Sequence, residues 1–210
     1  GLLFYKLLKT NEMKNLVILF FMAMSTMAFA QEESRHSLGP TVGYNHSWLS
    51  GDAEGLSAKP GFNVGLIYNY SLMEHWGLGL GLLYSVEGYK IDGTDADANV
   101  AYVRVPLKLQ YFFGEWGQAF RPKLFAGPSL AFLAGAKTKQ GSNTIDFKDQ
   151  VEGFDVGLLV GLGFNYRLKD RMWLNFDLGY TNGFLDTYKS EAFDNKNRLI
   201  NANLGVAFGF

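Results

Sequence analysis

The residues best suited to catalysis or metal binding are three histidines, His36, His46 and His75, which lie far apart in the chain. His46 is close to Ser47 and Ser50, and a serine near a histidine is a minimal element of a hydrolase site. The strand pattern described below places the three histidines near a chain end and near two opposite rims. We therefore expect no metal site, no catalytic site and no cofactor.

An acidic stretch is the second candidate, because Asp95-x-Asp97-x-Asn99 imitates the first half of a calcium loop. Val100 and Pro106 occupy the positions where such a loop needs glycine and glutamate. This departure favours a solvated acidic loop over a specific calcium site.

The composition excludes several other kinds of chemistry. The chain has 210 residues, 48% of them hydrophobic and 16% aromatic, and no cysteine. Without cysteine there are no thiolate zinc sites, iron–sulfur clusters or disulfides. Since 19 Lys and Arg balance 20 Asp and Glu, the chain carries no basic footprint for nucleic acid. What is left is one domain with either a core or a lipid-facing surface.

The first part of the chain has the order of a secretory signal. Residues 13–30 begin with Met-Lys-Asn, continue with an apolar run from Leu16 to Met24, and end with small residues in Ala28-Phe29-Ala30. The run is too short to span a bilayer as a helix, which takes about 20 residues. We interpret the chain as a non-native upstream extension at 1–12, a signal peptide at 13–30 and a mature domain at 31–210.

From Leu38 onward the hydrophobic pattern has a period of two almost everywhere, which is the period of a β-strand. The alternating runs number eight, and no stretch of the mature chain has a helical period. They lie at Ser37–Trp48, Gly61–Tyr70, His75–Ile91, Asn99–Phe113, Phe120–Ala136, Val151–Leu168, Arg171–Leu185 and Arg198–Phe210. The sequence therefore predicts an all-β chain.

The polar face of these strands is rich in glycine, and this decides between a soluble sandwich and a membrane barrel. Glycine weakens a strand, and a face turned to water gains nothing from it. The interior of an eight-stranded barrel is only just wide enough for side chains, so glycine makes room there for a few long polar ones. We predict an eight-stranded antiparallel up-and-down transmembrane β-barrel whose apolar face meets lipid.

The predicted connections alternate in length along the chain. They lie at 50–60, 71–74, 92–98, 114–119, 137–150, 169–170 and 186–197. Outer-membrane barrels have short periplasmic turns and long outer loops. The prediction is an outer-membrane location with both termini in the periplasm.

Charged residues on the predicted inward face form the candidate site. They are Glu87, Arg104, Lys108, Arg121, Lys123, Asp155, Arg167 and Asp177. Because charges removed from bulk water must be paired, we expect a polar network that plugs the lumen. Asp177 lies near mid-strand, and its expected partner across the lumen is Arg104 or Lys108. A proton or ion path is the alternative.

The chain resembles the small PorT-like outer-membrane β-barrel proteins, and its architecture is similar to that of OmpX and of the OmpA membrane domain. The resemblance rests on the signal ending, on Gly-Leu-Gly-Leu-Gly at 77–81 and on the final strand at 204–210. It implies insertion by the barrel-assembly machinery, which reads alternating apolar residues that end in an aromatic one. The matching residues are Leu204, Val206, Phe208 and Phe210.

These observations together predict a non-catalytic outer-membrane protein with a structural, surface-interaction or export-accessory role. The expected partners are outer-membrane lipid, the assembly machinery during biogenesis, and a surface or secretion-system partner at the outer loops. Three alternatives stay open: a narrow porin, an outer-membrane lipid-modifying enzyme, and a lipocalin-like soluble carrier whose apolar face lines a pocket.

Overall fold

The computed structural model describes residues 35–51, 55–94, 96–140, 143–189 and 195–210. The predicted extension at 1–12 and the predicted signal peptide at 13–30 lie outside these residues. Within the described part of the chain, no helix has the length and apolar character needed to cross a membrane. The elements are β1 (His36–Gly51), β2 (Leu56–Ser71), β3 (Trp76–Ile91), β4 (Ala96–Phe112), β5 (Phe120–Gln140), β6 (Asn143–Asp146), η2 (Lys148–Gln150), β7 (Phe154–Lys169), β8 (Met172–Asp186) and β9 (Asn195–Gly209).

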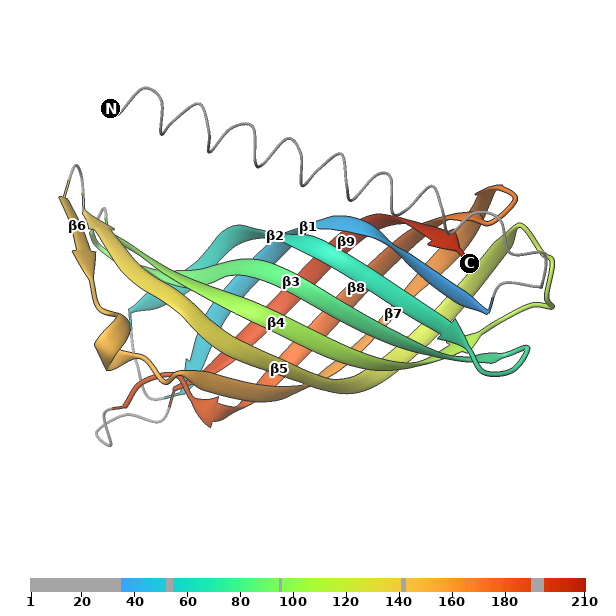
Figure 1. Cartoon of the computed structure of the whole chain (residues 1–210). Helices are drawn as coiled ribbons and strands as arrows, with labels where there is room; N and C mark the ends of the chain where they lie inside the picture. Colours follow the sequence, from blue (N-terminus) through green and yellow to red (C-terminus); the bar gives the residue numbers. More distant parts are fainter. Residues whose placement is uncertain (1–34, 52–54, 95, 141–142, 190–194) are drawn as a thin grey trace, which may run out of the picture.

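Eight of the described strands close into an antiparallel barrel (Figure 1). Each strand pairs with its neighbour in the order β1-β2-β3-β4-β5-β7-β8-β9, and β9 returns to pair with β1. The remaining strand, β6, pairs only with the end of β5. The predicted fold is confirmed.

The two faces of the barrel wall are inverted relative to a soluble protein. Lys123, Gln110 and Glu87 are among the largest fully buried side chains. On the outside, Leu82 is 54% exposed and Leu162 is 53% exposed. The alternation in the sequence thus separates a polar interior from an apolar exterior, as predicted. A soluble carrier would need the apolar face inside, so that alternative is wrong.

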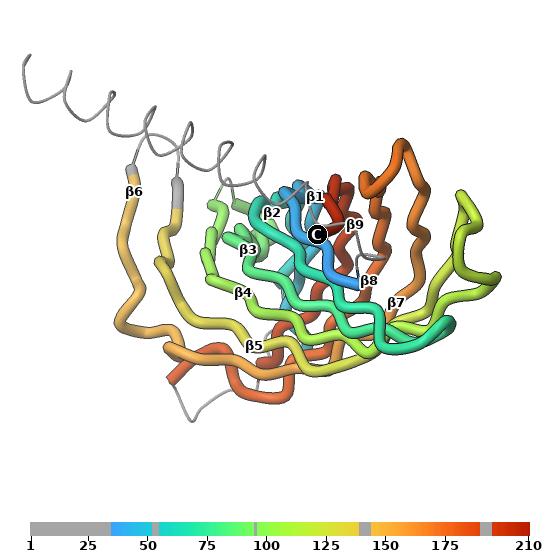
Figure 2. Tube along the Cα trace, turned by 45° about the vertical axis from the view of Figure 1, so that its right-hand side comes forward, coloured from blue at the N-terminus to red at the C-terminus, as the bar shows by residue number. Residues whose placement is uncertain are grey.

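Five of the eight wall strands, β1, β2, β4, β5 and β9, are longer than predicted and extend into the expected loops. They run from 15 residues in β9 to 21 in β5, whereas about 9–11 suffice to cross a bilayer. Ladder pairing continues where the hydrophobic alternation has stopped, for example between Asp97 and Lys139. Beyond it, β5 and β6 form a hairpin within the predicted loop at 137–150, and this hairpin projects from the barrel (Figure 2).

The two rims of the barrel differ. We call the rim with connections 72–75, 113–119 and 170–171 the turn end; Arg35 and Phe210 also lie there, at the right in Figure 1. The opposite rim, which carries the β5–β6 hairpin, is the loop end. At the turn end the amide of Phe210 donates to the carbonyl of His36 at 2.9 Å, which ties the last described residue to the start of β1.

An apolar cluster forms at the loop end. Its buried members are Val100, Tyr102, Ala131, Ala136 and Val151, and Leu133, Phe147 and Tyr188 pack against them. The hydroxyl of Tyr188 hydrogen bonds to that of Tyr89. Burial, together with this hydrogen bond, raises the pKa of Tyr188 above its ordinary value of 10.0.

Candidate functional site

One buried carboxylate, Asp177 on β8, holds two lysines in the middle of the lumen. Lys108 Nζ on β4 lies 2.6 Å from Asp177 Oδ2, and Lys123 Nζ on β5 lies 2.7 Å from Oδ1. All three side chains are at most 9% exposed. This cluster joins three strands and carries one net positive charge when every member is ionised.

A missing side chain lets Lys123 reach Asp177. In the strand register Lys123 pairs with Gly163 on β7, and Gly163 in turn pairs with Asp177. The three residues form one row across three adjacent strands. A Cβ on Gly163 would lie 2.0 Å from the backbone carbonyl oxygen of Phe176 and 2.8 Å from Asp177 Oδ1, which is the oxygen that faces Lys123. Glycine here leaves open the path along which the ion pair forms.

The same arrangement recurs on the other side of the barrel. Gly43 on β1 pairs with Asn63 on β2 and with Asn203 on β9. Asn63 Nδ2 donates to Asn203 Oδ1 at 2.8 Å, passing over the glycine. A Cβ on Gly43 would lie 1.7 Å from that acceptor oxygen. At both places a glycine lies between two polar residues on the flanking strands, and its missing side chain leaves room for them to interact. We call Gly43 and Gly163 window glycines.

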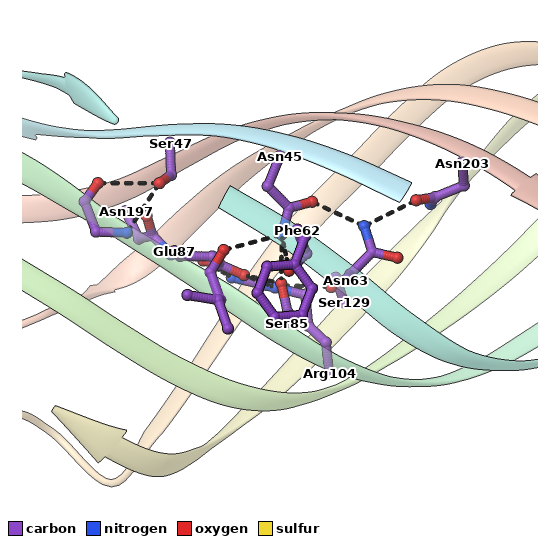
Figure 3. Close-up of polar contacts among 12 residues, drawn as sticks. Asn45, Ser47, Phe62, Asn63, Ser85, Glu87, Arg104, Ser129, Asn197 and Asn203 are labelled. Carbon is purple, nitrogen blue, oxygen red and sulfur yellow. Dashed lines mark hydrogen bonds and ion pairs between the residues drawn. The ribbon is translucent and has the colours of Figure 1, made fainter. Parts of the chain in front are cut away.

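A second ionic cluster centres on Glu87 and lies nearer the loop end (Figure 3). Arg104 Nε and Nη2 lie 2.6 and 2.7 Å from the two oxygens of Glu87, which is a bidentate pairing. Asn197 Nδ2 donates to Glu87 Oε2 at 2.6 Å. Arg104 Nη1 also donates to Ser129 Oγ at 3.3 Å. The cluster thereby links β3, β4, β5 and β9.

A chain of hydrogen bonds connects this cluster to the Asn63–Asn203 pair (Figure 3). Asn63 Nδ2 also donates to Asn45 Oδ1 at 2.8 Å, and Asn45 Nδ2 donates to Ser85 Oγ at 2.9 Å. Ser85 Oγ donates to Glu87 Oε1 at 2.7 Å. The sequence pattern of charges does not single out these asparagines. A signal for them exists, since they lie on the inward period beside glycines.

The structure places five of the eight predicted lumen residues in these two clusters: Glu87, Arg104, Lys108, Lys123 and Asp177. Asp155 is buried near Arg104 and interacts with it electrostatically, but the two do not form a close ion pair. Arg121 lies at the turn end, over the Phe112 ring and hydrogen bonded to the carbonyl of Glu74. Arg167 is exposed, with its guanidinium 6.0 Å from the Trp173 ring centroid. Five of the predicted lumen residues thus lie in two hydrogen-bonded clusters, and Arg121 and Arg167 lie apart from both at the turn end.

Little space is left inside the barrel. The internal cavity between the two clusters measures about 30 Å³ and is lined by Arg104, Lys108 and Asp177, among others. That volume holds one or two water molecules and no larger solute. The buried rings of Tyr102 and Phe125 fill further interior space. The arrangement is a packed polar plug.

The residues first considered for catalysis do not converge. Ser47 is buried, and its hydroxyl exchanges hydrogen bonds of 2.9 Å with the backbone carbonyl and amide of Gly88. The ring of His46 instead contacts Trp48, because consecutive strand residues point to opposite faces. His36 and His75 hydrogen bond to the Tyr68 hydroxyl and to the Phe112 carbonyl respectively.

A lysine side chain lies beside the residues that resemble the first half of a calcium loop. Lys59 Nζ lies 2.5 Å from Asn99 Oδ1 and 3.8 Å from Asp97 Oδ2. Asp95 lies outside the described residues. A side-chain ammonium therefore stands beside two of the oxygens that the motif would offer to a cation.

Comparisons with known proteins agree with this geometry. The profile of the family described as "Outer membrane protein beta-barrel domain" matches residues 29–189. No curated protein matches the chain. Among solved structures, the outer membrane protein OprG from Pseudomonas aeruginosa is similar, with 16% identity, a TM-score of 0.57, and coverage of 84% of this chain and 96% of that one.

Neisserial surface protein A is also similar, with 18% identity, a TM-score of 0.50, and coverage of 82% of this chain and 97% of that one. At these identities the likeness concerns the fold alone. The family profile, by contrast, spans most of the sequence. The chain therefore belongs to the outer-membrane β-barrel domain family.

Proposed function

We propose that this protein is a sealed, non-catalytic barrel that serves the outer membrane as a structural element and presents its loop end to a partner. The observation that carries the proposal is the lumen, in which Lys108, Lys123 and Asp177 join side chains from three strands. A pore needs a continuous water path, and the central cavity of about 30 Å³ provides none. Both termini lie in the periplasm in this arrangement.

Conductance tests the sealed lumen. We expect the refolded protein to give no stable conductance above leak in planar bilayers. The variant Lys108→Ser/Lys123→Ser/Asp177→Ser removes the central side chains and is expected to leak, which also verifies insertion. A reproducible ohmic channel from the unsubstituted protein would replace this proposal with the narrow porin.

The loop end supports an interaction role. The β5–β6 hairpin rises beyond the barrel wall, and Ile145 near its tip is 59% exposed. An ordered hairpin that extends beyond the barrel wall gives a protein partner a defined surface, and Ile145 is an apolar contact on it. We place the surface or secretion-system partner there, in line with the export role that the resemblance to PorT-like proteins implies.

A complemented deletion strain tests the interaction. The strain is scored for secretion, adhesion and detergent sensitivity after complementation with the unsubstituted chain or with Ile145→Ser. We expect Ile145→Ser to reach normal levels in the membrane but to restore secretion or adhesion poorly. The control is Lys148→Ser, which changes an exposed residue next to the hairpin. Leu185→Ser would not serve as a control, because a polar residue on the barrel wall disturbs insertion. Full complementation by Ile145→Ser would remove the hairpin from the proposal.

Biogenesis is the remaining part of the proposal. Leu204 and Phe208 on β9 are exposed on the outer face, and Val206 lies between them in the same alternation. Phe210 follows the end of β9. This pattern supports recognition by the barrel-assembly machinery, with outer-membrane lipid covering the apolar wall afterwards.

A further inference from the structure

A basin of about 450 Å³ opens at the turn end of the barrel, away from the two lumen clusters. Four arginines line it: Arg35, Arg121, Arg167 and Arg171. The one acidic residue among the described residues that line it is Asp170. Its volume falls in the range of pockets that bind small organic molecules, which run from about 300 to 1,000 Å³. The lining therefore favours an anion.

The floor of the basin contains buried polar atoms that have no partner. Gln110 is fully buried, and its Nε2 donates to Asn69 Oδ1 at 3.0 Å while its Oε1 accepts no hydrogen bond. Arg121 is 8% exposed, and its Nε donates none. Buried polar groups are nearly always satisfied in folded proteins. The floor thus lacks both a donor for Gln110 and an acceptor for Arg121.

Two further unpaired atoms lie around the same basin. They are Asn69 Nδ2 and Asn165 Oδ1. Aromatic rings also lie against two of the guanidinium groups: Phe112 is 4.9 Å from that of Arg121, and Trp173 is 6.0 Å from that of Arg167. Stacking of this kind limits the motion of a guanidinium without using its N–H donors. The site therefore offers oriented cations together with unpaired acceptors.

We propose that the turn-end basin binds a phosphate ester that also carries hydroxyl groups. Guanidinium groups match the oxygens of a phosphate in paired hydrogen bonds, and several of them can share the non-bridging oxygens of a monoester or a diester. The hydroxyls of the ester donate to Gln110 Oε1 and Asn165 Oδ1, so that the phosphate group keeps its own oxygens for the guanidinium groups. This binding function is independent of the sealed lumen and of the loop-end partner.

Tryptophan fluorescence of the refolded protein measures the binding, because Trp116 and Trp173 line the basin. The probes are glycerol 3-phosphate, inorganic phosphate, glycerol and glycerate, the last being a carboxylate with the same hydroxyls. We expect saturable binding of glycerol 3-phosphate with a Kd about tenfold lower than those of phosphate and glycerate. Absence of saturation, or glycerate binding as tightly, would overturn the proposal.

A pair of charge-matched variants locates the site. Arg35→Gln/Arg167→Gln removes two exposed basin charges, and Lys148→Gln/Lys189→Gln removes two exposed charges outside the basin. We expect the first variant to raise the Kd of glycerol 3-phosphate about tenfold and the second to leave it unchanged, with unaltered melting in both. An equal loss in the two variants would show that the attraction is nonspecific.

Two further measurements refine the assignment. Gln110→Leu is expected to reduce the preference for glycerol 3-phosphate over inorganic phosphate, and an unchanged preference would contradict the role of Oε1. Nanodiscs of phosphatidylcholine with or without phosphatidylglycerol distinguish the source of the phosphate ester. Competition by phosphatidylglycerol assigns the basin to a lipid headgroup, whereas unchanged binding of glycerol 3-phosphate assigns it to a soluble ligand.

Discussion

Lys123 and Asp177 approach to 2.7 Å from strands that are not neighbours, across the backbone of Gly163. The relationship explains why the inward face carries both long charged side chains and glycine. At Gly163 and Gly43 the absence of a side chain lets polar residues on the two flanking strands approach each other. In this barrel the positions of glycine therefore select which polar residues interact.

Adding a side chain at the window glycine Gly163 is expected to lower the free energy of unfolding of the barrel. In Gly163→Val the new side chain would meet both the backbone carbonyl of Phe176 and the Asp177 carboxylate, and overpacking typically costs about 1–3 kcal/mol. Urea unfolding of the refolded protein, followed by tryptophan fluorescence, measures the loss. Gly135→Ala is the control, because a Cβ on Gly135 meets nothing within 4 Å. Equal effects of the two substitutions would contradict the window.

Removing the charge of Asp177 should lower the free energy of unfolding by more than Gly163→Val does. Asp177→Asn leaves two buried ammonium groups without a counter-charge, and breaking a buried pair in this way costs about 3–5 kcal/mol. The triple variant Lys108→Met/Lys123→Met/Asp177→Asn has no buried charge at this level and is expected to recover most of the loss. The same unfolding assay compares them. Additive losses across the three sites would show that the residues do not act as a cluster.

Because the exterior of the barrel is apolar, an arginine substitution on the outer face is expected to reduce folding into a membrane. Leu162 lies on the outer face between Leu124 and Leu178, which are also exposed. Leu162→Arg is expected to cost roughly 2–4 kcal/mol near the bilayer midplane and to reduce the folded fraction in vesicles, as judged by heat-modifiable migration. Leu162→Met should fold normally. Normal folding of the arginine variant would contradict a lipid-facing position.

The Tyr89–Tyr188 contact predicts an alkaline effect at the loop end. Because the pKa of Tyr188 is raised in the folded protein, its contribution to stability is present below pH 10 and is lost as the pH rises further. One such group changes the free energy of unfolding by at most about 1.4 kcal/mol per pH unit. Stability measured in detergent from pH 8 to 11.5 should fall more steeply in the unsubstituted protein than in Tyr188→Phe. Identical slopes would remove Tyr188 as the cause.

Much of this barrel can be predicted from the sequence because a strand has a period of two. That period fixes which residues face inward, so Glu87, Lys123 and Asp177 are identifiable as lumen residues from the amino-acid sequence alone. It does not fix which residues meet across the lumen. That depends on the stagger of the strands, and therefore the sequence offers Asp177 either Arg104 or Lys108 as a partner and does not indicate Lys123.

The loop end is harder to predict for a different reason. Hydrophobic alternation ends where lipid ends, but backbone hydrogen bonding continues, so β2 and β5 run on past their predicted limits. The residues at 143–146 show no alternation that would indicate β6. Arg167 lies on the inward period and lines the turn-end basin, but near the rim its long side chain is exposed to solvent.

The pairing of β1 with β9 has a consequence for how the chain folds. Thr41 donates to the carbonyl of Leu204, 163 residues further along, and this seam closes the ring. The other wall pairings of the described residues join strands that are consecutive around the barrel and close in sequence, with only β6 and η2 between β5 and β7. The seam is therefore the most nonlocal step, and folding to a closed ring waits for β9. Until then two unpaired strand edges and an apolar face are available for association with other molecules. A newly made chain therefore has to be kept apart from its own copies until its final strand has joined its first.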